Sequence, residues 1–490
     1  MSGIGIEFRQ IIKKPSPMKV IQSIGYSFAT TLIPLLVVIL ALLVMYKILP
    51  YDSTPYNSRE LLSSSILYVF ILSLLFTAGL GAPVSRFLAN AVYKENYSKI
   101  MPCYYSGLLI CLVFEAFFSI PLYYQEVKRG GADFSFVIIT YLMLIILTIV
   151  FYNLTFVSAT KRYKDIALFF SMGMGISVIF SFFLQKVVGV VAAIQDSLMI
   201  GFLAVALLEF GLILSSFPKG DLSYWDFPLY LQNSKRLFLA NLFYSLGLFV
   251  HNFIFWTGEL GRVTAKVYLN APVYDLASAV AMYTNIMASV VFVIEIETRF
   301  ASRYKSYSDA VVSGRWKDIL LMKKRMFRML SDIIMKAVEI QFISAVVIFL
   351  ICSVLLPRIG FSGLPMSIYP CLAAGYFAVY VMYGQILFLY YFEDDTGALI
   401  TSIVFLAGTI LCSKITMQFL PITWYGMGLL GGAMLGWTYG YFRLKWLEEN
   451  FDAHIFCTGQ VIESRPEKFP ESKIYDRKSG GLRDHPVKGN

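Results

Sequence analysis

Charged side chains and histidines are scarce in this sequence. Only 15% of its 490 residues are charged and 3 are histidines, whereas 58% are hydrophobic and the mean hydropathy is +0.67. Soluble globular domains carry charge on about a quarter of their residues, so the surplus apolar surface needs lipid. The sequence also lacks a GxxxxGK[ST] loop, and we therefore expect that the protein itself does not hydrolyse ATP.

The cysteines indicate neither disulfide bonds nor a metal site. The 6 cysteines form no CxxC pair, and most lie inside or beside apolar segments, so neither a disulfide framework nor a zinc site is predicted. We expect no metal and no cofactor. No soluble catalytic domain is visible, and the only acidic triplet, Glu393 to Asp395, lies in a short predicted turn. These absences argue against an enzyme such as a glycosyltransferase or an acyltransferase.

Apolar stretches of about 20 residues, the length that crosses a bilayer core as a helix, recur along the whole chain. They predict an all-α integral membrane protein of about twelve transmembrane helices. The short apolar stretch 187–194 is placed in an external turn or at the interface. The spans are expected near 23–48, 63–84, 104–124, 136–158, 166–184, 198–217, 236–256, 272–294, 340–356, 369–392, 398–417 and 423–442.

The net charge of +10 could suggest a nucleic-acid partner, but the positions of the basic residues exclude one. With a cytoplasmic N-terminus, alternate loops place 25 Lys and Arg on the inner side and 9 on the outer side. This asymmetry follows the positive-inside rule. It predicts a multi-pass protein of the bacterial cytoplasmic membrane with both termini in the cytoplasm. The first apolar stretch, 26 residues long, is too long for a cleavable signal peptide.

Two six-helix halves are predicted, residues 1–217 and 218–448, because this plan recurs among transporters with the substrate path between the halves. No internal sequence repeat is visible. The polar tail 449–490 lacks apolar periodicity, and we expect it to be largely disordered.

The longest connection, residues 299–336, mixes ten basic residues with Met322, Met326, Phe327, Met329 and Leu330. It reads as an amphipathic helix at the inner surface, which could contact anionic lipid headgroups, dock a cytoplasmic protein, or do both. The candidate docking residues are Arg315, Lys317, Lys323, Lys324, Arg325 and Arg328.

Polar residues inside the spans are the best functional indicators, since a charge at the bilayer centre is costly and must face protein or water. Spans seven and eight each carry a polar face at helical spacing. Such residues could simply join neighbouring helices, but together they predict a shared polar path. The candidate path residues are Arg86, Glu115, Asn241, Ser245, His251, Asn252, Trp256, Asp275, Asn285 and Glu297, with Glu209 as a further buried acid.

His251, Trp256 and Asp275 are expected at the outer ends of these two spans. An aromatic ring beside a carboxylate can hold a sugar by stacking and hydrogen bonding, although Trp256 could also be an interfacial anchor. Arg86 follows Gly79, Gly81 and Pro83, which could form a hinge or cap a helix.

Several segments resemble the PelG family of exopolysaccharide transporters. They are GIGIEFR at 3–9, RFLAN at 86–90, KRYKDIALFF at 161–170, HNFIFWTG at 251–258, NAPVYDLASAVAMYT at 270–284 and ETRFASRYKSY at 297–307. The resemblance covers most of the chain, and its most specific segments surround spans seven and eight. It implies membership of the multidrug, oligosaccharidyl-lipid and polysaccharide exporter superfamily, with two six-helix halves around a central cavity.

The resemblance also implies a cargo and partners. The cargo would be an N-acetylgalactosamine-rich polymer, and the partners a cytoplasmic glycosyltransferase and other Pel inner-membrane subunits, one of which reads cyclic di-GMP. No catalytic residues are implied. We expect export along a path lined in part by spans one, two, seven and eight. Flipping of a lipid-linked oligosaccharide, or cation-coupled antiport of small molecules through Glu115, Glu209 or Asp275, remain the alternatives.

Overall fold

The computed structural model describes residues 17–160, 162–218, 220–285, 289, 292, 295–358 and 363–458. These residues are almost entirely helical. Helices of the first part of the chain are α2 (Pro17–Ile48), α3 (Tyr56–Tyr93), α4 (Ile100–Arg129), α5 (Phe134–Thr160), α6 (Tyr163–Val188) and α7 (Val190–Ser216).

A short helix, α8 (Asp226–Asn233), leads into the second set. This set contains α9 (Lys235–Phe255), a hairpin of β1 (Arg262–Thr264) and β2 (Tyr268–Asn270), α10 (Pro272–Tyr283), the π-helical turn η3 (Ile296–Phe300), α12 (Ala301–Ser313), α13 (Trp316–Arg358), α14 (Leu364–Tyr391), α15 (Asp395–Phe419) and α16 (Met427–Thr458). The chain forms two compact units, Met1–Tyr441 and Phe442–Asn490.

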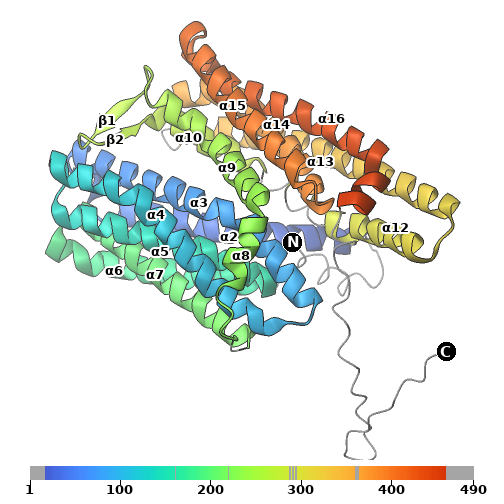
Figure 1. Ribbon diagram of the computed structural model, residues 1–490. Helices are drawn as coiled ribbons and strands as arrows, with labels where there is room; N and C mark the ends of the chain where they lie inside the picture. The colour runs from blue at the N-terminus through green and yellow to red at the C-terminus, as the bar shows by residue number, and fades with distance from the viewer. Residues whose placement is uncertain are drawn as a thin grey trace, which may run out of the picture. The chain divides into compact units, whose positions relative to one another are not determined.

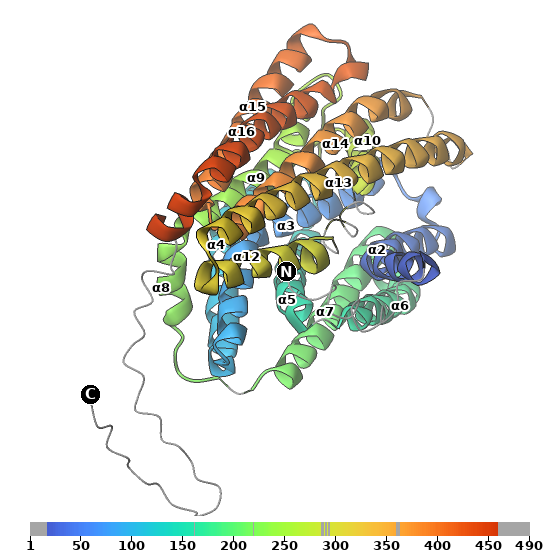
Figure 2. The same cartoon turned by 90° about the vertical axis from the view of Figure 1, so that its right-hand side faces the viewer.

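Within the first unit the helices pack as two neighbouring sets (Figures 1 and 2). In one set α5 lies between α3, α4 and α7, while α6 packs against α2 and α7. In the other, α9 packs against α15, and α14 contacts α10, α13 and α15. Helix α3 also packs along α9, and we call this contact the α3–α9 seam. It is the main direct contact between the two sets.

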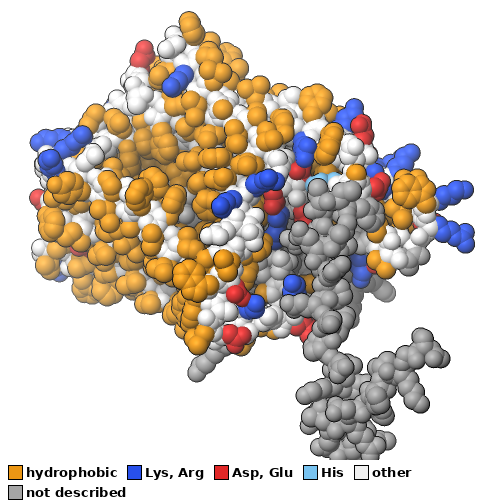
Figure 3. Space-filling view, in the orientation of Figure 1, with side chains coloured by type: hydrophobic (Ala, Val, Ile, Leu, Met, Phe, Trp, Pro, Cys, Tyr) orange, Lys and Arg blue, Asp and Glu red, His pale blue; other side chains and the backbone are white. Residues whose placement is uncertain are grey.

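The described part of each of the twelve predicted spans falls on a helix of the structure, and the all-α membrane fold is confirmed. Most of the second half of the eighth span, 272–294, lies outside the described residues. Within the described ranges, nine helices are long and apolar enough to cross a membrane. The remaining three predicted spans fall on α2, α10 and α16. The described apolar parts of these three helices are shorter or less apolar than those of the nine. Hydrophobic side chains cover much of the face in Figure 3, and basic side chains gather near α12.

The stretch 187–194 contains the predicted turn, but the turn is a single residue: α6 runs to Val188 and α7 starts at Val190, because Gly189 makes the turn alone with a φ of +88°. Two other details of the predicted architecture are wrong. The connection 299–336 is not one amphipathic helix, since α12 ends at Ser313 and α13 runs unbroken from Trp316 into span nine. Finally, α16 continues beyond Glu448 to Thr458, with a kink at Asn450.

Residues 459–490, the rest of the predicted tail, lie outside the described residues, as does the segment 3–9. The run from Gly79 to Pro83 does not cap a helix, because α3 continues to Tyr93. Instead, Gly79 gives room at the seam: a Cβ atom there would lie 2.5 Å from the Phe238 ring of α9.

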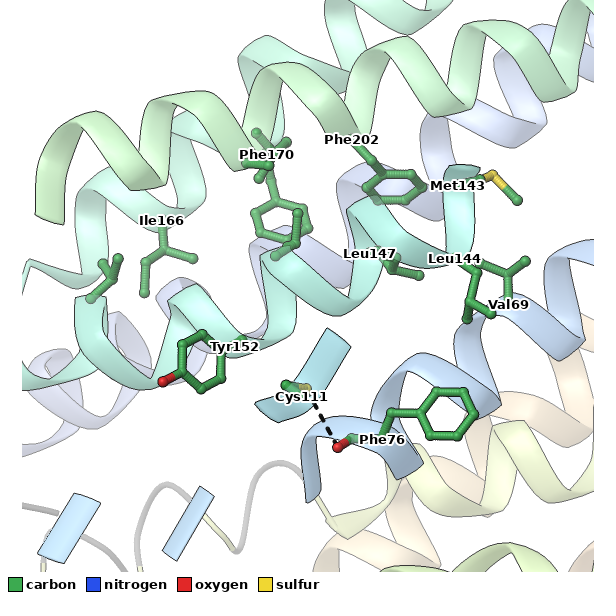
Figure 4. Close-up of a cluster of buried hydrophobic side chains, with 14 of the residues drawn as sticks. Val69, Phe76, Cys111, Met143, Leu144, Leu147, Tyr152, Ile166, Phe170 and Phe202 are labelled. Carbon is green, nitrogen blue, oxygen red and sulfur yellow. Dashed lines mark hydrogen bonds between the residues drawn. The ribbon is translucent and has the colours of Figure 1, made fainter. Parts of the chain in front are cut away.

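Aromatic and aliphatic side chains fill the interior of the first helix set. Figure 4 shows Phe76, Leu147, Tyr152 and Phe202 among them, and the Cys111 thiol donates to the carbonyl of Phe76 at 3.5 Å. Lipid competes for apolar side chains, so helix association in a membrane depends on close packing rather than on hydrophobic burial. Small residues make such packing possible.

The backbones of α6 and α7 approach each other closely at two glycines. A Cβ atom on Gly201 would lie 2.7 Å from the carbonyl oxygen of Gly173, whereas one on Gly211, also in α7, would meet nothing within 4 Å. Overpacking costs about 1–3 kcal/mol. We therefore expect Gly201→Val to lower the midpoint of thermal unfolding in detergent, and Gly211→Val to leave it near that of the wild type. Equal midpoints for the two variants would contradict this account of the α6–α7 contact.

Candidate functional site

The hairpin between α9 and α10 reaches across to the other helix set. Strands β1 and β2 pair antiparallel, with Val263 opposite Leu269. Ala265 and Lys266 in the turn have φ of +49° and +59°, a conformation that non-glycine residues seldom adopt. We call residues 262–270 the hairpin latch, because its contacts join the two helix sets at one end of the α3–α9 seam.

Side chains of α3 and α4 hold the hairpin latch on both of its strands. The Tyr68 hydroxyl donates to the carbonyl of Leu269 at 2.8 Å and accepts from its backbone N–H at 3.0 Å. The Tyr268 hydroxyl donates to the buried carboxylate of Glu126 at 2.6 Å. Arg129 donates to the carbonyl of Lys266 at 3.0 Å. These polar contacts fix the hairpin to the first helix set.

Asp275, in the first turn of α10, lies beside this latch and is buried. One carboxylate oxygen accepts from the Asn252 amide and the Trp256 indole N–H, both at 2.8 Å. The other accepts from the indole at 3.0 Å and from the backbone N–H of Ala271 at 3.0 Å. A buried carboxylate needs several donors to offset its lost hydration, and Asp275 has them.

Trp256 connects this carboxylate to α3. Its ring stacks on Tyr68, with centroids 5.1 Å apart and planes 22° apart. Trp256, Asp275, Asn252 and Tyr68 therefore form one cluster, the Asp275 cluster, across the α3–α9 seam. The predicted association of Trp256 with Asp275 is present in the structure, and the indole is only 5% exposed. This burial argues against a role for Trp256 as an interfacial anchor in this conformation.

His251 does not join the Asp275 cluster, contrary to the predicted trio. Its Nδ1 lies 2.8 Å from the Tyr274 hydroxyl, and its ring centroid is 6.1 Å from that of Tyr376 on α14. The side chain is fully buried, and Nε2 has no hydrogen-bond partner among the described residues. The Tyr376 hydroxyl lies 2.8 Å from that of Ser278. His251 thus belongs to a second polar cluster that faces α14.

The other predicted residues of spans seven and eight lie in two places, at the α3–α9 seam and against α13 and α14. Asn241 donates to the carbonyl of Ala78 on α3, and Ser245 is half-buried on α9. Asn285 donates to the carbonyl of Tyr376 at 3.1 Å and accepts from Gln341 of α13. The polar face of α9 therefore does lie at the α3–α9 seam, whereas Asn285 faces α13 and α14.

Arg86 marks the opposite end of the seam. Its guanidinium makes two bonds of 2.9 Å to the carboxylate of Asp395 at the start of α15, and donates to the carbonyl of Tyr390 at 3.2 Å. A bidentate arginine–carboxylate pair is directional and stronger than a hydrogen bond between neutral groups. Burial raises the pKa of the nearby Tyr230 hydroxyl on α8. The Arg86–Asp395 pair joins α3 to α15.

The acidic triplet has structural roles. Glu393 adopts a φ of +58° in the turn, and the Asp394 side chain caps α15 by accepting from the N–H of Gly397 at 3.0 Å. Asp395 binds Arg86. Within the described residues, no group of three or more His, Cys, Asp or Glu side chains is placed to hold a metal ion.

The remaining predicted acids lie apart from the seam clusters. Glu115 on α4 is 1% exposed and Glu209 on α7 is 0% exposed. In the part of the chain that the structure describes, none of their carboxylate oxygens has a hydrogen-bond partner, although Thr148 and Asn153 of α5 lie close by. Glu297 lies in η3, and its side chain is outside the described residues.

The basic residues of α13 and of the turn before it have the predicted amphipathic arrangement. Met326, Phe327 and Leu330 are buried. Phe327 stacks on Phe392 at the end of α14, with centroids 5.5 Å apart. Lys323 is half-buried, and the exposed candidates are Arg315, Lys317, Lys324, Arg325 and Arg328.

Sequence reasoning missed Tyr68, Tyr268, Glu126, Tyr376 and Asp395. Most of their partners are more than 90 positions away in the chain, for example 309 positions between Arg86 and Asp395. Only the repeated tyrosines of α14 gave a local signal, which is their regular spacing.

The fold is that of known transporters. A transporter of the multidrug, oligosaccharidyl-lipid and polysaccharide (MOP) superfamily from Pyrococcus furiosus is 15% identical and superposes with a TM-score of 0.61, covering 92% of this chain and 99% of its own. An outward-facing multidrug resistance transporter of the MATE family is 15% identical, with a TM-score of 0.59 and coverage of 92% and 100%. At this identity the likeness concerns the fold alone.

No curated protein sequence matches the chain. A family model does: the model of the PelG exopolysaccharide exporter (EPS-E) matches residues 1–456. This range contains both helix sets, the hairpin latch and the Arg86–Asp395 pair. The chain therefore belongs to the PelG family of exopolysaccharide exporters.

Proposed function

We propose that this transporter moves a growing, Pel-like, N-acetylgalactosamine-rich polysaccharide across the bacterial cytoplasmic membrane along the α3–α9 seam. The observation that carries the proposal is the family match over residues 1–456. The basic residues favour cytoplasmic termini, with 25 on the inner side and 9 on the outer. On this orientation the Arg86–Asp395 pair lies at the cytoplasmic end of the seam and the hairpin latch at the outer end.

The two ends of the seam would act as successive closures. Both use polar contacts between helix sets, which can be exchanged for contacts to water or sugar when the sets separate. The hairpin latch would close the outer end through Tyr68, Glu126 and Arg129. The Arg86–Asp395 pair would close the inner end. Motion of one rigid helix set against another is the usual basis of alternating access.

The Asp275 cluster is the candidate sugar contact at the outer end. In this conformation the carboxylate is fully occupied by Asn252, Trp256 and the backbone of Ala271. Separation of Tyr68 from Trp256 would uncover the indole face, which could then stack on a pyranose ring. The carboxylate and the Asn252 amide could bond to its hydroxyl and acetamido groups.

Asp275→Asn and Trp256→Ala should therefore reduce polymer secretion about tenfold or more when they replace the chromosomal gene. Asparagine puts an N–H₂ group where donors converge, and alanine removes both the stack and the indole donor; each change removes more than the 1.4 kcal/mol that corresponds to a factor of ten. His251→Ala should change secretion only through Tyr274 and Tyr376, the residues that the histidine contacts. The measurement is secreted polymer, with membrane protein levels checked by immunoblot.

Glu259→Gln is the matched control for that experiment, because Glu259 is an exposed acid three residues beyond Trp256. It should secrete as the wild type does. Normal secretion by both Asp275→Asn and Trp256→Ala would exclude the Asp275 cluster from the export path and leave it a purely structural contact.

The cytoplasmic glycosyltransferase is proposed to dock on the basic face of α13. This face is mechanically connected to the inner closure: Phe327 stacks on Phe392, and the turn that follows Phe392 carries Asp395, the partner of Arg86. A protein bound to Lys324, Arg325 and Arg328 could thus bias the inner closure through packed side chains. Anionic lipid headgroups could occupy the same face when no enzyme is bound.

Replacing Lys324, Arg325 and Arg328 together by Glu should abolish co-purification of the Pel glycosyltransferase, since repulsion would replace three attractions. Co-purification from detergent-solubilised membranes measures this. Lys128→Glu, an exposed charge reversal at the other end of the spans, should leave the complex intact. Persistence of the complex in the triple variant would assign this face to lipid rather than to the enzyme.

Glu115 and Glu209 favour a second candidate function, the cation-coupled antiport of small molecules. Each has a buried carboxylate without a hydrogen-bond partner among the described residues. An unpaired carboxylate in such an environment needs a proton or another cation to balance its charge. These groups could also couple an ion gradient to polymer export.

Ethidium accumulation separates the two functions. For a polysaccharide exporter, cells with the wild type, with Glu209→Gln, or without the gene should accumulate ethidium equally, because the dye is not the cargo. An antiporter would lower accumulation in a way that Glu209→Gln abolishes. That second outcome, together with unchanged polymer secretion in the deletion strain, would replace our proposal by the antiporter function.

A further inference from the structure

Helix α14 carries tyrosine at seven-residue intervals. Tyr369, Tyr376, Tyr383 and Tyr390 follow one another at this spacing. At 100° per residue a seven-residue step turns the helix by 700°, only about 20° short of two full turns, so the four side chains share one face. The first and last are about 32 Å apart along the axis at 1.5 Å per residue, close to the roughly 30 Å core of a bilayer.

The last three of these tyrosines connect the two ends of the proposed path. Tyr376 contacts Ser278 and lies beside His251, near the latch end. Tyr383 stacks on Tyr244 of α9, with centroids 4.7 Å apart and planes 24° apart. Tyr390 accepts from Arg86 through its carbonyl at the other end. Rings of α14 and α9 thus run between the two closures.

Not every hydroxyl group on this helix face has a hydrogen-bond partner among the described residues. Tyr383 and Tyr390 are half-buried, and the Tyr390 hydroxyl is buried without a hydrogen-bond partner among the described residues. Leaving a buried hydroxyl unpaired is unfavourable. A site that binds hydroxyl-rich chains intermittently would have this property, because its own hydroxyls are paired only when the ligand is present.

We infer that Tyr376, Tyr383 and Tyr390, together with Tyr244, form a tyrosine track on which the sugar rings of the polymer slide. The inference rests on the proposed function and identifies the surface that receives the chain. Each ring offers an apolar face for a pyranose and a hydroxyl for its polar edge. Single stacking contacts are weak enough to be exchanged as the polymer advances. No charge that could hold one sugar in place lies on these four side chains.

The same helix supplies a control. Tyr380 lies four residues after Tyr376 and three before Tyr383, so it neighbours both on the helix surface, but its ring packs edge-on against Phe292, with centroids 6.1 Å apart. Its hydroxyl is also buried and unpaired within the described part of the chain. Tyr380→Ala therefore removes the same atoms from the same helix but leaves the stacked pair of Tyr383 and Tyr244 in place.

The variants Tyr383→Ala, Tyr390→Ala and their double should be placed in the deletion strain beside Tyr380→Ala and the wild type. We expect the double variant to secrete about tenfold less polymer at equal membrane levels, since it loses two stacking contacts, and tenfold corresponds to about 1.4 kcal/mol. Tyr383→Phe and Tyr390→Phe, which keep the rings, should lose less. Tyr380→Ala should stay close to the wild type.

Photocrosslinking tests the contact itself. A benzophenone amino acid at position 383 should capture polymer in secreting cells, detected by a lectin on the purified protein, whereas the same probe at position 380 should not. Polymer captured equally at both positions, or at neither, would overturn the track. A wild-type gene that fails to restore secretion to the deletion strain would instead refute the proposed function.

Discussion

The hydrogen bonds to the carboxylate of Asp275 fix the Trp256 indole, the ring through which α9 contacts α3 at the latch end of the seam. Inside a membrane every polar group must find a partner within the protein, and this carboxylate takes its partners from α9 and from the backbone before α10. Once the Trp256 indole is fixed by Asp275, its ring stacks on Tyr68 of α3. The Tyr68 hydroxyl in turn donates to the backbone of the hairpin latch. Loss of one buried charge would therefore loosen α9, α10, the hairpin and their contact with α3.

Polar contacts would suit the proposed export along the α3–α9 seam, because polar groups that separate can be hydrated. A separated Arg86 and Asp395 could each bind water, and a released Tyr68 could bond to water or, on the proposed function, to sugar. The large apolar contacts are kept within each set, for example between α6 and α7 or between α9 and α15. Each set can then move as a body while the polar groups at the seam change partners.

The sequence predicted the spans well and the connections poorly, for a physical reason. A run of about 20 apolar residues satisfies its own backbone as a helix in lipid whatever surrounds it, so the described parts of all twelve spans fall on helices. The polar face of α9 was also readable, since helical periodicity is local. In contrast, the hairpin latch, the Arg86–Asp395 pair and the separation of His251 from Asp275 depend on contacts between distant segments. Gly189 was missed because one residue sufficed for a turn that normally takes several.

The tyrosine track proposed on α14 would be a polar path that is not lined by charges. Helix α14 is the most buried of the candidate spans in the described ranges, with 83% of its apolar window inside the protein, yet its most regular feature is a row of phenol rings rather than of aliphatic side chains. Leucine would fill an apolar interior without a hydroxyl to satisfy, whereas the Tyr390 hydroxyl has no partner among the described residues. On the proposed track a charged residue would bind one sugar tightly and stop the chain. Tyrosine would avoid both extremes, since its ring would supply a weak contact without fixed register and its hydroxyl a bond that can be made and broken as the polymer moves.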